Sequence, residues 1–350
     1  MQARPAPDPV NSQFAARHWY RFSALSALLY PVSLLFRLVV GSRLLLFRLH
    51  LLRPTRLPVP VIVVGNLTVG GTGKTPLVLW LARTLREQGR RPGVIASGYR
   101  GTRREPAAVT GGDDPRVSGD EAVLLAMRAG TPVWSGSDRV RVATALLRAH
   151  PECDLLICDD GLQHYRLARD LEIAVEDARG FGNGCMLPAG PLREPATRRV
   201  DARVVNATVE ARDNLPPGAY RMRLEPAGLF RLDQPERCID AASLRGKRLH
   251  AVAGIGDPRR FFASLDALGL AVTAHAFADH HDYAEHELVF DNCDAVLMTE
   301  KDAVKCKRFT ARTDFAGFSR PDLYALRVEA SLDPGFAQFL EKWLHGLKAS

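Results

Sequence analysis

Residues 68–75 have the composition of a loop that binds phosphate groups. They read Thr-Val-Gly-Gly-Thr-Gly-Lys-Thr, and they follow an apolar run that predicts a strand and open a stretch that predicts a helix. Glycines let backbone N–H groups turn toward phosphate oxygens, Lys74 can reach the β- and γ-phosphates, and Thr75 can bind Mg²⁺. The alternative is a glycine-rich turn with an incidental lysine. The predicted binding set is Thr68, Val69, Gly70, Gly71, Thr72, Gly73, Lys74 and Thr75.

Two acids end another apolar run of the chain. Leu-Leu-Ile-Cys-Asp-Asp at 155–160 is typical of a strand that holds Mg²⁺ beside a phosphate loop, with Asp159 on the metal and Asp160 next to it. A strand that ends in Asp is common, so this pattern gains its meaning only from the phosphate loop.

Further polar residues could take part in proton transfer. Asp120 and Glu121 begin a predicted helix, where an acid also serves as an ordinary cap. Asp279-His280-His281-Asp282 places two histidines between carboxylates, which could bind a metal or supply a base oriented by an acid. A solvated loop is the alternative for this second group.

A loop rich in glycine and proline ends in an arginine and a glutamate. Gly-Asn-Gly at 182–184 is followed by Leu-Pro-Ala-Gly-Pro-Leu and then by Arg193 and Glu194. Such a shaped loop could hold a phosphate and a hydroxylated ligand, or it could be an irregular connection.

The elements that position these residues alternate between strand and helix. Predicted strands lie at 61–66, 92–97, 132–135, 154–160, 171–177 and 202–207, and predicted helices at 74–88, 119–128 and 138–150. Continuous apolar strands joined by helices are typical of a doubly wound, mainly parallel α/β sheet. The general phosphate-loop motif begins with glycine, so Thr68 departs from it, but this context supports the assignment.

The second half of the chain predicts a smaller α/β domain. Residues around 221–236 look irregular, 247–258 begin a new strand–loop–helix series, 295–305 and 323–330 predict strands, and 334–347 predict a closing helix. The expected organisation is a flexible tail at 1–18, a membrane-associated helix at 19–53, a phosphate-loop domain at 54–222 and a smaller domain at 223–350.

An apolar segment near the N-terminus carries arginines through its length. The stretch 32–52 contains Arg37, Arg43 and Arg48 among leucines, valines and phenylalanines. Arginines are costly in the centre of a bilayer, so the pattern favours a helix that lies in the membrane interface with its charges at the lipid phosphates. A core helix and a membrane-spanning helix are the alternatives.

Composition and charge narrow the possible functions. The 350 residues are 46% apolar and 25% charged, which excludes a mainly disordered or fibrous chain. Six scattered cysteines without a CxxC pair favour neither a disulfide framework nor a zinc site. The net charge of +8 favours a polyanionic partner, such as nucleic acid, an anionic membrane or a phosphorylated ligand. A basic surface that serves only solubility is the alternative. No nucleic-acid reader motif accompanies this charge, and we expect no nucleic-acid partner.

Several motifs together resemble the tetraacyldisaccharide 4′-kinase family, the lipid A 4′-kinases of Gram-negative bacteria. They are found at 59–78, 118–126, 159–173, 177–195, 277–283 and 298–305, and the similarity covers most of the chain. Thr68 belongs to the loop of that family. The resemblance implies a lipid kinase that uses ATP and Mg²⁺ to phosphorylate the 4′-hydroxyl of an acylated glucosamine disaccharide 1-phosphate. It also implies an anionic inner membrane surface as partner and a place on its cytoplasmic face.

The resemblance also implies roles for individual residues. Asp120 and His280 would form the pair that takes the proton from the sugar hydroxyl, and Lys74 would stabilise the transferred phosphate. Thr75, Glu121, Asp159 and Asp160 would form the metal site. The disaccharide and its phosphate would be held by Tyr99, Gln163, His164, Arg193 and Glu194. Base and metal would then come from different domains, whose closure around ATP would assemble the site.

One position departs from the family pattern. The family usually has Ser-Arg-Gly-Tyr after the second strand, whereas this chain has Ser97, Gly98, Tyr99 and Arg100, with Ser97 at the usual arginine position. We expect that contact to be lost unless Arg100 replaces it.

Two other functions fit the motifs without the resemblance. One is a phosphate-loop kinase of a soluble metabolite, which the apolar N-terminal segment argues against. The other is a nucleotide-dependent switch or scaffold at a membrane, which would form no phosphorylated lipid.

Overall fold

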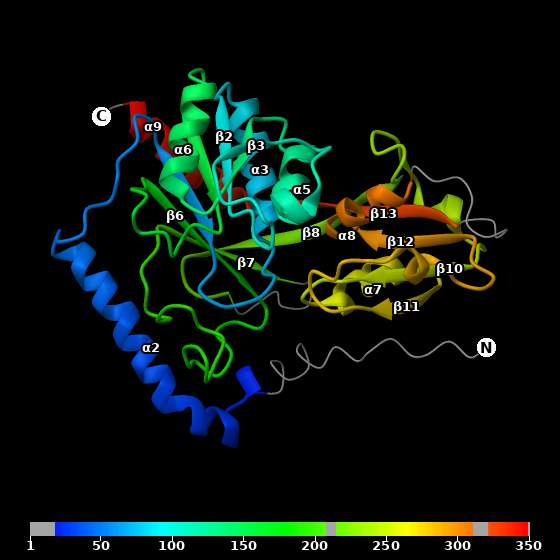
Figure 1. Cartoon of the computed structure of the whole chain (residues 1–350), viewed down its shortest axis with the longest axis horizontal. Helices are drawn as coiled ribbons and strands as arrows, with labels where there is room; N and C mark the ends of the chain where they lie inside the picture. Colours follow the sequence, from blue (N-terminus) through cyan, green and yellow to red (C-terminus); the bar gives the residue numbers. More distant parts are fainter. Residues whose placement is uncertain (1–17, 208–214, 311–320, 349–350) are drawn as a thin grey trace. The chain divides into compact units, whose positions relative to one another are not determined.

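The chain folds into two compact units. The computed structural model (Figure 1) describes residues 18–207, 215–310 and 321–348. Among these, the larger unit contains 18–113, 117–225 and 330–348, and the smaller contains 114–116 and 226–329. The tail predicted at 1–18 lies outside the described residues, apart from residue 18.

A mostly parallel sheet forms the centre of the larger unit. Its strand order is β8-β7-β6-β1-β5-β2-β4-β3, and only β3 is antiparallel to its neighbour. The bounds are β1 Val61–Gly65, β2 Pro92–Ala96, β3 Ala107–Val109, β4 Val133–Ser135, β5 Leu155–Asp159, β6 Leu171–Asp177, β7 Ala202–Asn206 and β8 Ala219–Arg231. The predicted doubly wound α/β fold is confirmed.

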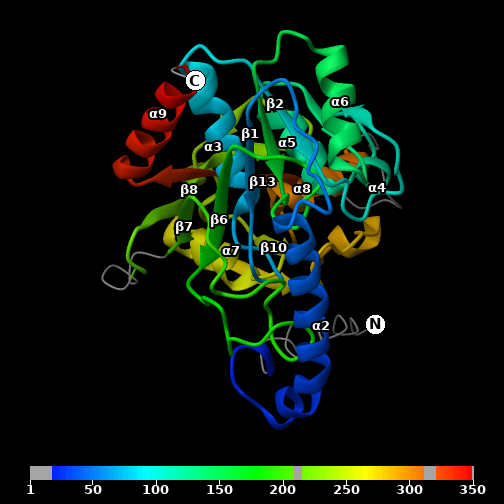
Figure 2. The same cartoon turned by 90° about the vertical axis from the view of Figure 1, so that its left-hand side faces the viewer.

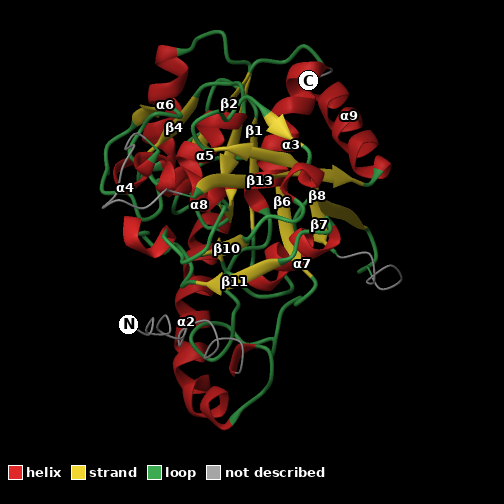
Figure 3. Ribbon diagram, turned by 90° about the vertical axis from the view of Figure 1, so that its right-hand side faces the viewer, coloured by secondary structure: helices red, strands yellow, loops and turns green. Residues whose placement is uncertain are grey.

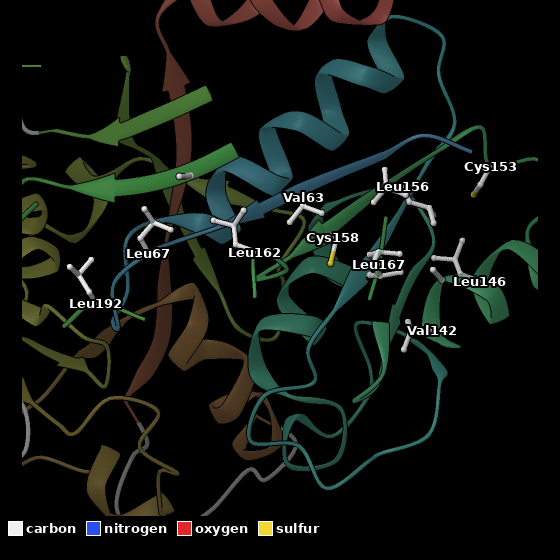
Figure 4. Close-up of a cluster of buried hydrophobic side chains, with 14 of the residues drawn as sticks. Val63, Leu67, Val142, Leu146, Cys153, Leu156, Cys158, Leu162, Leu167 and Leu192 are labelled. Carbon is white, nitrogen blue, oxygen red and sulfur yellow. The ribbon is translucent and has the colours of Figure 1, made fainter. Parts of the chain in front are cut away.

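Helices cover the sheet of the larger unit, as Figure 2 shows. They are α3 Lys74–Glu87, α5 Asp120–Arg128 and α6 Arg139–Ala149. The short helix α4, Pro115–Ser118, begins in the smaller unit and ends in the larger one. Every residue of β1 and β5 is buried, as expected for parallel strands covered on both faces. Figure 4 shows one core cluster, in which Val142 and Leu146 of α6 pack with Val63 of β1 and Leu156 of β5.

The apolar N-terminal segment forms the helix α2, Ala24–Arg48. It begins at Ser23, whose side chain accepts a hydrogen bond from the backbone N–H of Ser26. Ser33 donates a hydrogen bond to the backbone oxygen of Met186 at 2.7 Å, and Phe36 and Val40 pack against the core. Most of its other apolar side chains are exposed, and it is long and apolar enough to cross a membrane.

The smaller unit has two core clusters of its own, and its strands, drawn in yellow in Figure 3, belong to the same sheet, which runs on through β8. The strand order is β11-β10-β12-β13-β8, with the short β9 antiparallel to β8. Its elements are β9 Cys238–Ile239, β10 Leu249–Ala253, α7 Pro258–Ala267, β11 Val272–Ala276, β12 Ala295–Thr299, α8 Glu300–Cys306 and β13 Asp322–Leu332, with 3₁₀ turns η1 Ala241–Leu244, η2 Glu285–Leu288 and η3 Lys307–Phe309.

Two sequence-based predictions in this half of the chain are wrong. The stretch 221–236, expected to be irregular, contains most of the long strand β8. Its alternation of apolar and polar residues is hidden because charged residues in the strand are partly buried and because Pro226 and Gly228 interrupt the pattern. The strand expected over 295–305 ends at Thr299, because the Thr299 side chain accepts a hydrogen bond from the backbone N–H of Asp302 and caps α8.

The predicted domain at 223–350 also needs a correction at its end. The last helix, α9 Pro334–Lys348, belongs to the larger unit. Phe336 is fully buried and lies against the rings of Trp80 and Tyr220, and Trp343 donates a hydrogen bond to the backbone oxygen of Asp170. The chain therefore enters the smaller unit along β8 and returns along β13.

Candidate active site

The carboxyl ends of four neighbouring strands bring the predicted phosphate-binding and acidic residues together. Val64 of β1 lies opposite Asp159 of β5, and Gly65 lies opposite Ala174 of β6. On the next pair, Asp177 of β6 lies opposite Asn206 of β7. Parallel strands end at the same edge of a sheet, where open α/β folds bind their ligands.

The loop at 68–75 leads from β1 into α3, as the sequence predicted. Gly73 is the N-cap of α3 at a φ of 96°, and a Cβ atom there would lie 2.8 Å from Nδ2 of Asn206. That same Nδ2 donates to the backbone oxygen of Thr72 at 3.1 Å. Nδ2 of Asn66 donates to the backbone oxygen of Gly70, also at 3.1 Å. Asparagines therefore hold the loop from two sides.

The proline-rich loop braces the phosphate loop from a third side. The backbone N–H of Val69 donates to the oxygen of Pro191 at 2.8 Å, and that of Arg193 donates to the oxygen of Leu67 at 2.7 Å. Thr68 and Leu192 form an isolated antiparallel bridge between these bonds. The backbone at position 68 thus belongs to a short two-stranded contact between the two loops.

Arg179 lies at the site but was not among the residues predicted from the sequence. Its Nε donates to Oδ2 of the buried Asp177 at 2.9 Å, and its guanidinium lies 3.5 Å from the backbone oxygen of Gly71. The same guanidinium lies 5.3 Å from the centre of the Tyr20 ring. The only signal in the sequence was its place in the Asp-Ala-Arg-Gly stretch that follows β6.

Asp160 is the acid that pairs with cations. Its Oδ1 lies 3.5 Å from Nζ of Lys74, and both of its oxygens lie 3.2 Å from a guanidinium nitrogen of Arg193. Burial opposes ionisation, but Lys74 and Arg193 hold the pKa of this carboxyl below its ordinary value. Its backbone is left-handed, at a φ of 48°, which is rare outside glycine and frequent at functional sites.

Asp159 has the opposite environment. It is 2% exposed, and its Oδ1 has no hydrogen-bond partner among the described residues. Burial, together with the negative charge of Glu121, raises the pKa of this carboxyl to about 7. An acid in this state keeps its proton to a higher pH than an ordinary aspartate does.

The predicted residues at the start of α5 also lie in the larger unit. Asp120 is buried, and its Oδ1 accepts a hydrogen bond from the backbone N–H of Glu121 at 2.9 Å. Gly119 before it has a φ of 89°, and a Cβ atom there would lie 2.9 Å from the backbone of Gly98. The loop 97–101 is therefore packed directly onto the start of α5.

That loop carries one predicted substrate residue and the departure from the family pattern. Tyr99 is 56% exposed, and its backbone N–H donates to Oγ of Ser97 at 3.0 Å. The guanidinium of Arg100 lies 5.9 Å from the centre of the Tyr99 ring. A contact of Arg100 with a ligand stays a prediction.

Glu194 and Gln163 belong to a buried polar network. Glu194 is 1% exposed, and both of its oxygens lie 2.6 Å from the guanidinium of Arg198. The same carboxylate accepts hydrogen bonds from Gln163 and from the hydroxyl of Tyr165. Arg198 also binds Glu172. The network fixes the end of the proline-rich loop.

The histidine pair lies in the smaller unit. His280 has a φ of 61°, and its Nε2 lies 3.1 Å from Nζ of Lys301. An ammonium group only donates, so this nitrogen accepts and Nδ1 carries the proton. The other histidine, His281, binds Glu287 through its Nε2 at 2.9 Å. Asp120 lies in the larger unit, so its pairing with His280 stays a prediction.

The arrangement suits Mg²⁺ at the edge of the sheet. Among the residues that the structure describes, Oδ1 of Asp159 has no hydrogen-bond partner. Burial with the charge of Glu121 outweighs the opposing charges of Lys74 and Arg139, so a bound cation would stabilise the ionised carboxylate. Within the described ranges, three acid, histidine or cysteine side chains do not converge into a complete metal cage. Mg²⁺ usually keeps several waters and phosphate oxygens as ligands, so a partial set of protein donors is what it requires.

Comparisons with known proteins agree with this site. The family model described as Tetraacyldisaccharide-1-P 4′-kinase matches residues 25–345. The chain belongs to this family. Curated relatives named tetraacyldisaccharide 4′-kinase include one from Methylobacillus flagellatus, 46% identical over 93% of this chain and 94% of its own. Another, from Azoarcus sp., is 47% identical over 95% of this chain and 96% of its own.

A solved relative has the same fold. The "apo" form of LpxK from Aquifex aeolicus, crystallised in complex with ATP, superposes with a TM-score of 0.76 at 29% identity, covering 92% of this chain and 98% of its own. The family resemblance that the sequence motifs indicated is thus confirmed.

Substitution of Asp159 tests its charge environment. Because its pKa is raised above the ordinary value of 3.8, the folded protein binds more protons than the unfolded chain up to about pH 7, and the free energy of unfolding falls as the pH rises through this window. We compare the free energy of unfolding of the metal-free proteins at about pH 5 and at about pH 8. From the lower to the higher pH, the stability of Asp159→Asn relative to the wild type should increase by roughly 1–4 kcal/mol. Urea denaturation at both pH values measures the difference.

The control for this experiment is Asp266→Asn, which removes an exposed acid of α7. Its free energy of unfolding should follow the wild type at both pH values. If the free energy of unfolding changes equally with pH in Asp159→Asn and in the wild type, the pKa of Asp159 is not raised.

Proposed function

We propose that this chain transfers the γ-phosphate of ATP to the 4′-hydroxyl of an acylated glucosamine disaccharide 1-phosphate, a step of lipid A biosynthesis. The observation that carries the proposal is the phosphate loop with Lys74 3.5 Å from Asp160 and the unpartnered carboxylate of Asp159 beside it. The relatives named tetraacyldisaccharide 4′-kinase and the ATP complex of the Aquifex aeolicus protein support the same activity.

Phosphoryl transfer needs position and charge neutralisation more than covalent chemistry. The backbone of residues 68–75 and Nζ of Lys74 would hold the phosphates of ATP. Thr75 and Asp159 would hold Mg²⁺, with Glu121 and Asp160 shaping the site around it. When bound, the metal supplies positive charge to the phosphate oxygens. Asp160, whose Oδ1 lies 3.5 Å from Nζ of Lys74, would hold the ammonium group in place at the loop.

The acceptor hydroxyl must lose a proton as it attacks. We assign this proton to His280, whose basic nitrogen is Nε2, with Asp120 as the acid that orients it. Nζ of Lys301 lies 3.1 Å from that nitrogen and would give up this contact to the substrate. His281 is engaged with Glu287 and has a supporting role.

The five predicted substrate residues divide into two groups. Tyr99 is exposed, and Arg193 and His164 are half-buried, so these three can reach a sugar or a phosphate. The carboxylate of Glu194 is already occupied by Arg198, Tyr165 and Gln163. We therefore propose that Glu194 and Gln163 act by positioning Arg193 and the braced loop.

The helix α2 suits the surface of an anionic membrane. Leu28, Leu35 and Leu38 are more than half exposed, and Arg37 and Arg48 are exposed on the same helix. Burial of these leucines in the acyl boundary, with the arginines at lipid phosphates, would stabilise an interfacial position. We propose that the enzyme works on the cytoplasmic face of the inner membrane, where ATP is present and the sugar head group is accessible.

Product formation tests the activity. With labelled ATP and an acylated disaccharide 1-phosphate, the wild type should form a lipid bisphosphate with one ATP used for each product. Lys74→Ala should lower turnover on the order of 10³-fold, because a cation on the transferred phosphate is lost. ATP consumption without a lipid product would indicate a nucleotide switch, and activity on a soluble acceptor alone would indicate another kinase.

The proposed acid–histidine pair makes a separate prediction. Asp120→Ala and His280→Ala should each slow turnover strongly, and the double variant should be little slower than the slower single variant, because residues that act as a unit are not additive. His281→Ala is the matched control and should lose less. Single losses that multiply in the double variant would show that the two residues act independently.

The interfacial position of α2 can be tested by topology. A protease added to intact spheroplasts should leave an N-terminal tag uncut, because an interfacial helix keeps both of its ends on the cytoplasmic side. As a control, the tag should be cut after the membrane is opened. Cleavage from the periplasmic side would show that α2 spans the membrane.

A further inference from the structure

A pocket in the larger unit lies between α2, the start of α6 and the segment after β5. Its lining includes Arg43 of α2, Asp138 and Arg139 at the start of α6, and His164 and Arg166 after β5. Neither the phosphate loop nor the acids Asp159 and Asp160 are among the residues that line it. The pocket is therefore a place for a group other than the phosphates of the nucleotide.

The charge of this pocket is positive. Three guanidinium groups face a single carboxylate, that of Asp138. Its Oδ1 accepts hydrogen bonds from the backbone N–H groups of Val140 and Arg141, and its Oδ2 lies 3.0 Å from Arg166. Asp138 is thus already satisfied by protein donors. Burial, reinforced by the positive charge of Arg139, lowers the pKa of His164 to about 4, so this histidine adds a neutral hydrogen-bonding group.

The burial and the hydrogen bonding of Arg139 point to a ligand. This residue is 3% exposed, and NH1 donates to the backbone oxygen of Gly136 at 2.9 Å. Its Nε has no hydrogen-bond partner in the described part of the chain. Asp159 and Asp160 are near enough for their charges to interact with this guanidinium, but among the described residues neither forms an ion pair with it. Burial of a guanidinium with an unpartnered N–H is costly, and an anion bound in the pocket would lower that cost.

The helix α2 supplies the other side of the pocket. The guanidinium of Arg43 lies 5.6 Å from the centre of the Tyr165 ring, and the ring of Phe47, one turn further, lies 5.7 Å from it. This half of α2 is thus fixed at the pocket, while most of the other apolar side chains of the helix stay exposed. An anion bound here would touch the helix that we place at the membrane surface.

We propose that this pocket binds a phosphate group carried by a lipid. Guanidinium groups recognise phosphate oxygens by paired hydrogen bonds, and Arg43, Arg139 and Arg166 offer three of them. The phosphate would be either the 1-phosphate monoester of the substrate, which rests on the proposed function, or the phosphodiester of a membrane phospholipid, which does not.

The first arm of the test uses two substrates. In Arg43→Gln, the KM for the acylated disaccharide 1-phosphate should rise about tenfold or more, while the KM for ATP stays the same. The same lipid without its 1-phosphate should show no such rise. Arg166→Gln should behave alike, since it also releases Asp138 toward the pocket.

The second arm uses vesicles of a neutral galactolipid with and without phosphatidylglycerol. If the pocket takes a phosphodiester, Arg43→Gln should lose several-fold of the binding that depends on phosphatidylglycerol, and both substrates should be affected equally. This arm reports on the pocket even if the wild type phosphorylates neither lipid, in which case only the proposed function fails.

Two substitutions serve as references in both arms. Arg48→Gln measures the loss of one exposed charge of α2 outside the pocket, and Arg148→Gln removes an exposed charge at the far end of α6. The proposal requires that Arg43→Gln cause a larger effect than Arg48→Gln in at least one arm, either a larger rise in KM or a larger loss of vesicle binding. If Arg43→Gln and Arg166→Gln match the reference variants in both arms, the pocket binds no lipid phosphate.

Discussion

The site depends on an unequal distribution of charge between two neighbouring carboxylates. Asp159 and Asp160 leave the same strand end, yet Asp160 lies near two cations, while Asp159 is buried near another acid. Two ionised carboxylates in so little water would repel each other and lose solvation. The protein satisfies one of them with Lys74 and Arg193 and leaves the other to be satisfied by what binds. Much of the surrounding architecture serves to keep this asymmetry.

The braced phosphate loop is one part of that architecture. Asn66 and Asn206 hold it from the strand ends, and the proline-rich loop adds a short backbone pairing at Thr68. Because Arg193 lies in the same braced loop, the position of one cation on Asp160 is linked to the position of Lys74. The buried network around Glu194 anchors the other end of this loop. A substitution in that network would therefore shift the position of Arg193 and disturb Asp160, even though the substituted residue touches no ligand.

Much of this could be predicted from the sequence, for physical reasons. Continuous apolar strands such as 61–65 and 155–159 are buried on both faces, so composition and position suffice to identify them. The long strand β8 could not be identified, since its mixed burial leaves no clear period. Gln163 and Glu194 were recognised as site residues by family pattern, but only the structure shows how completely their polar atoms are used by the protein. Arg179 and Lys301 became visible only when distant segments lay side by side.

The most direct test of the central claim is the release of protons when Mg²⁺ and ATP bind. Calorimetric titration at pH 7 in buffers of different ionisation enthalpy gives the number of protons released. Since the raised pKa of Asp159 leaves a fraction of this group protonated, we expect that fraction of a proton to be released from it in the wild type. That contribution should be absent in Asp159→Asn. Equal proton release by the two proteins would show that Asp159 is already ionised before the metal and the nucleotide arrive.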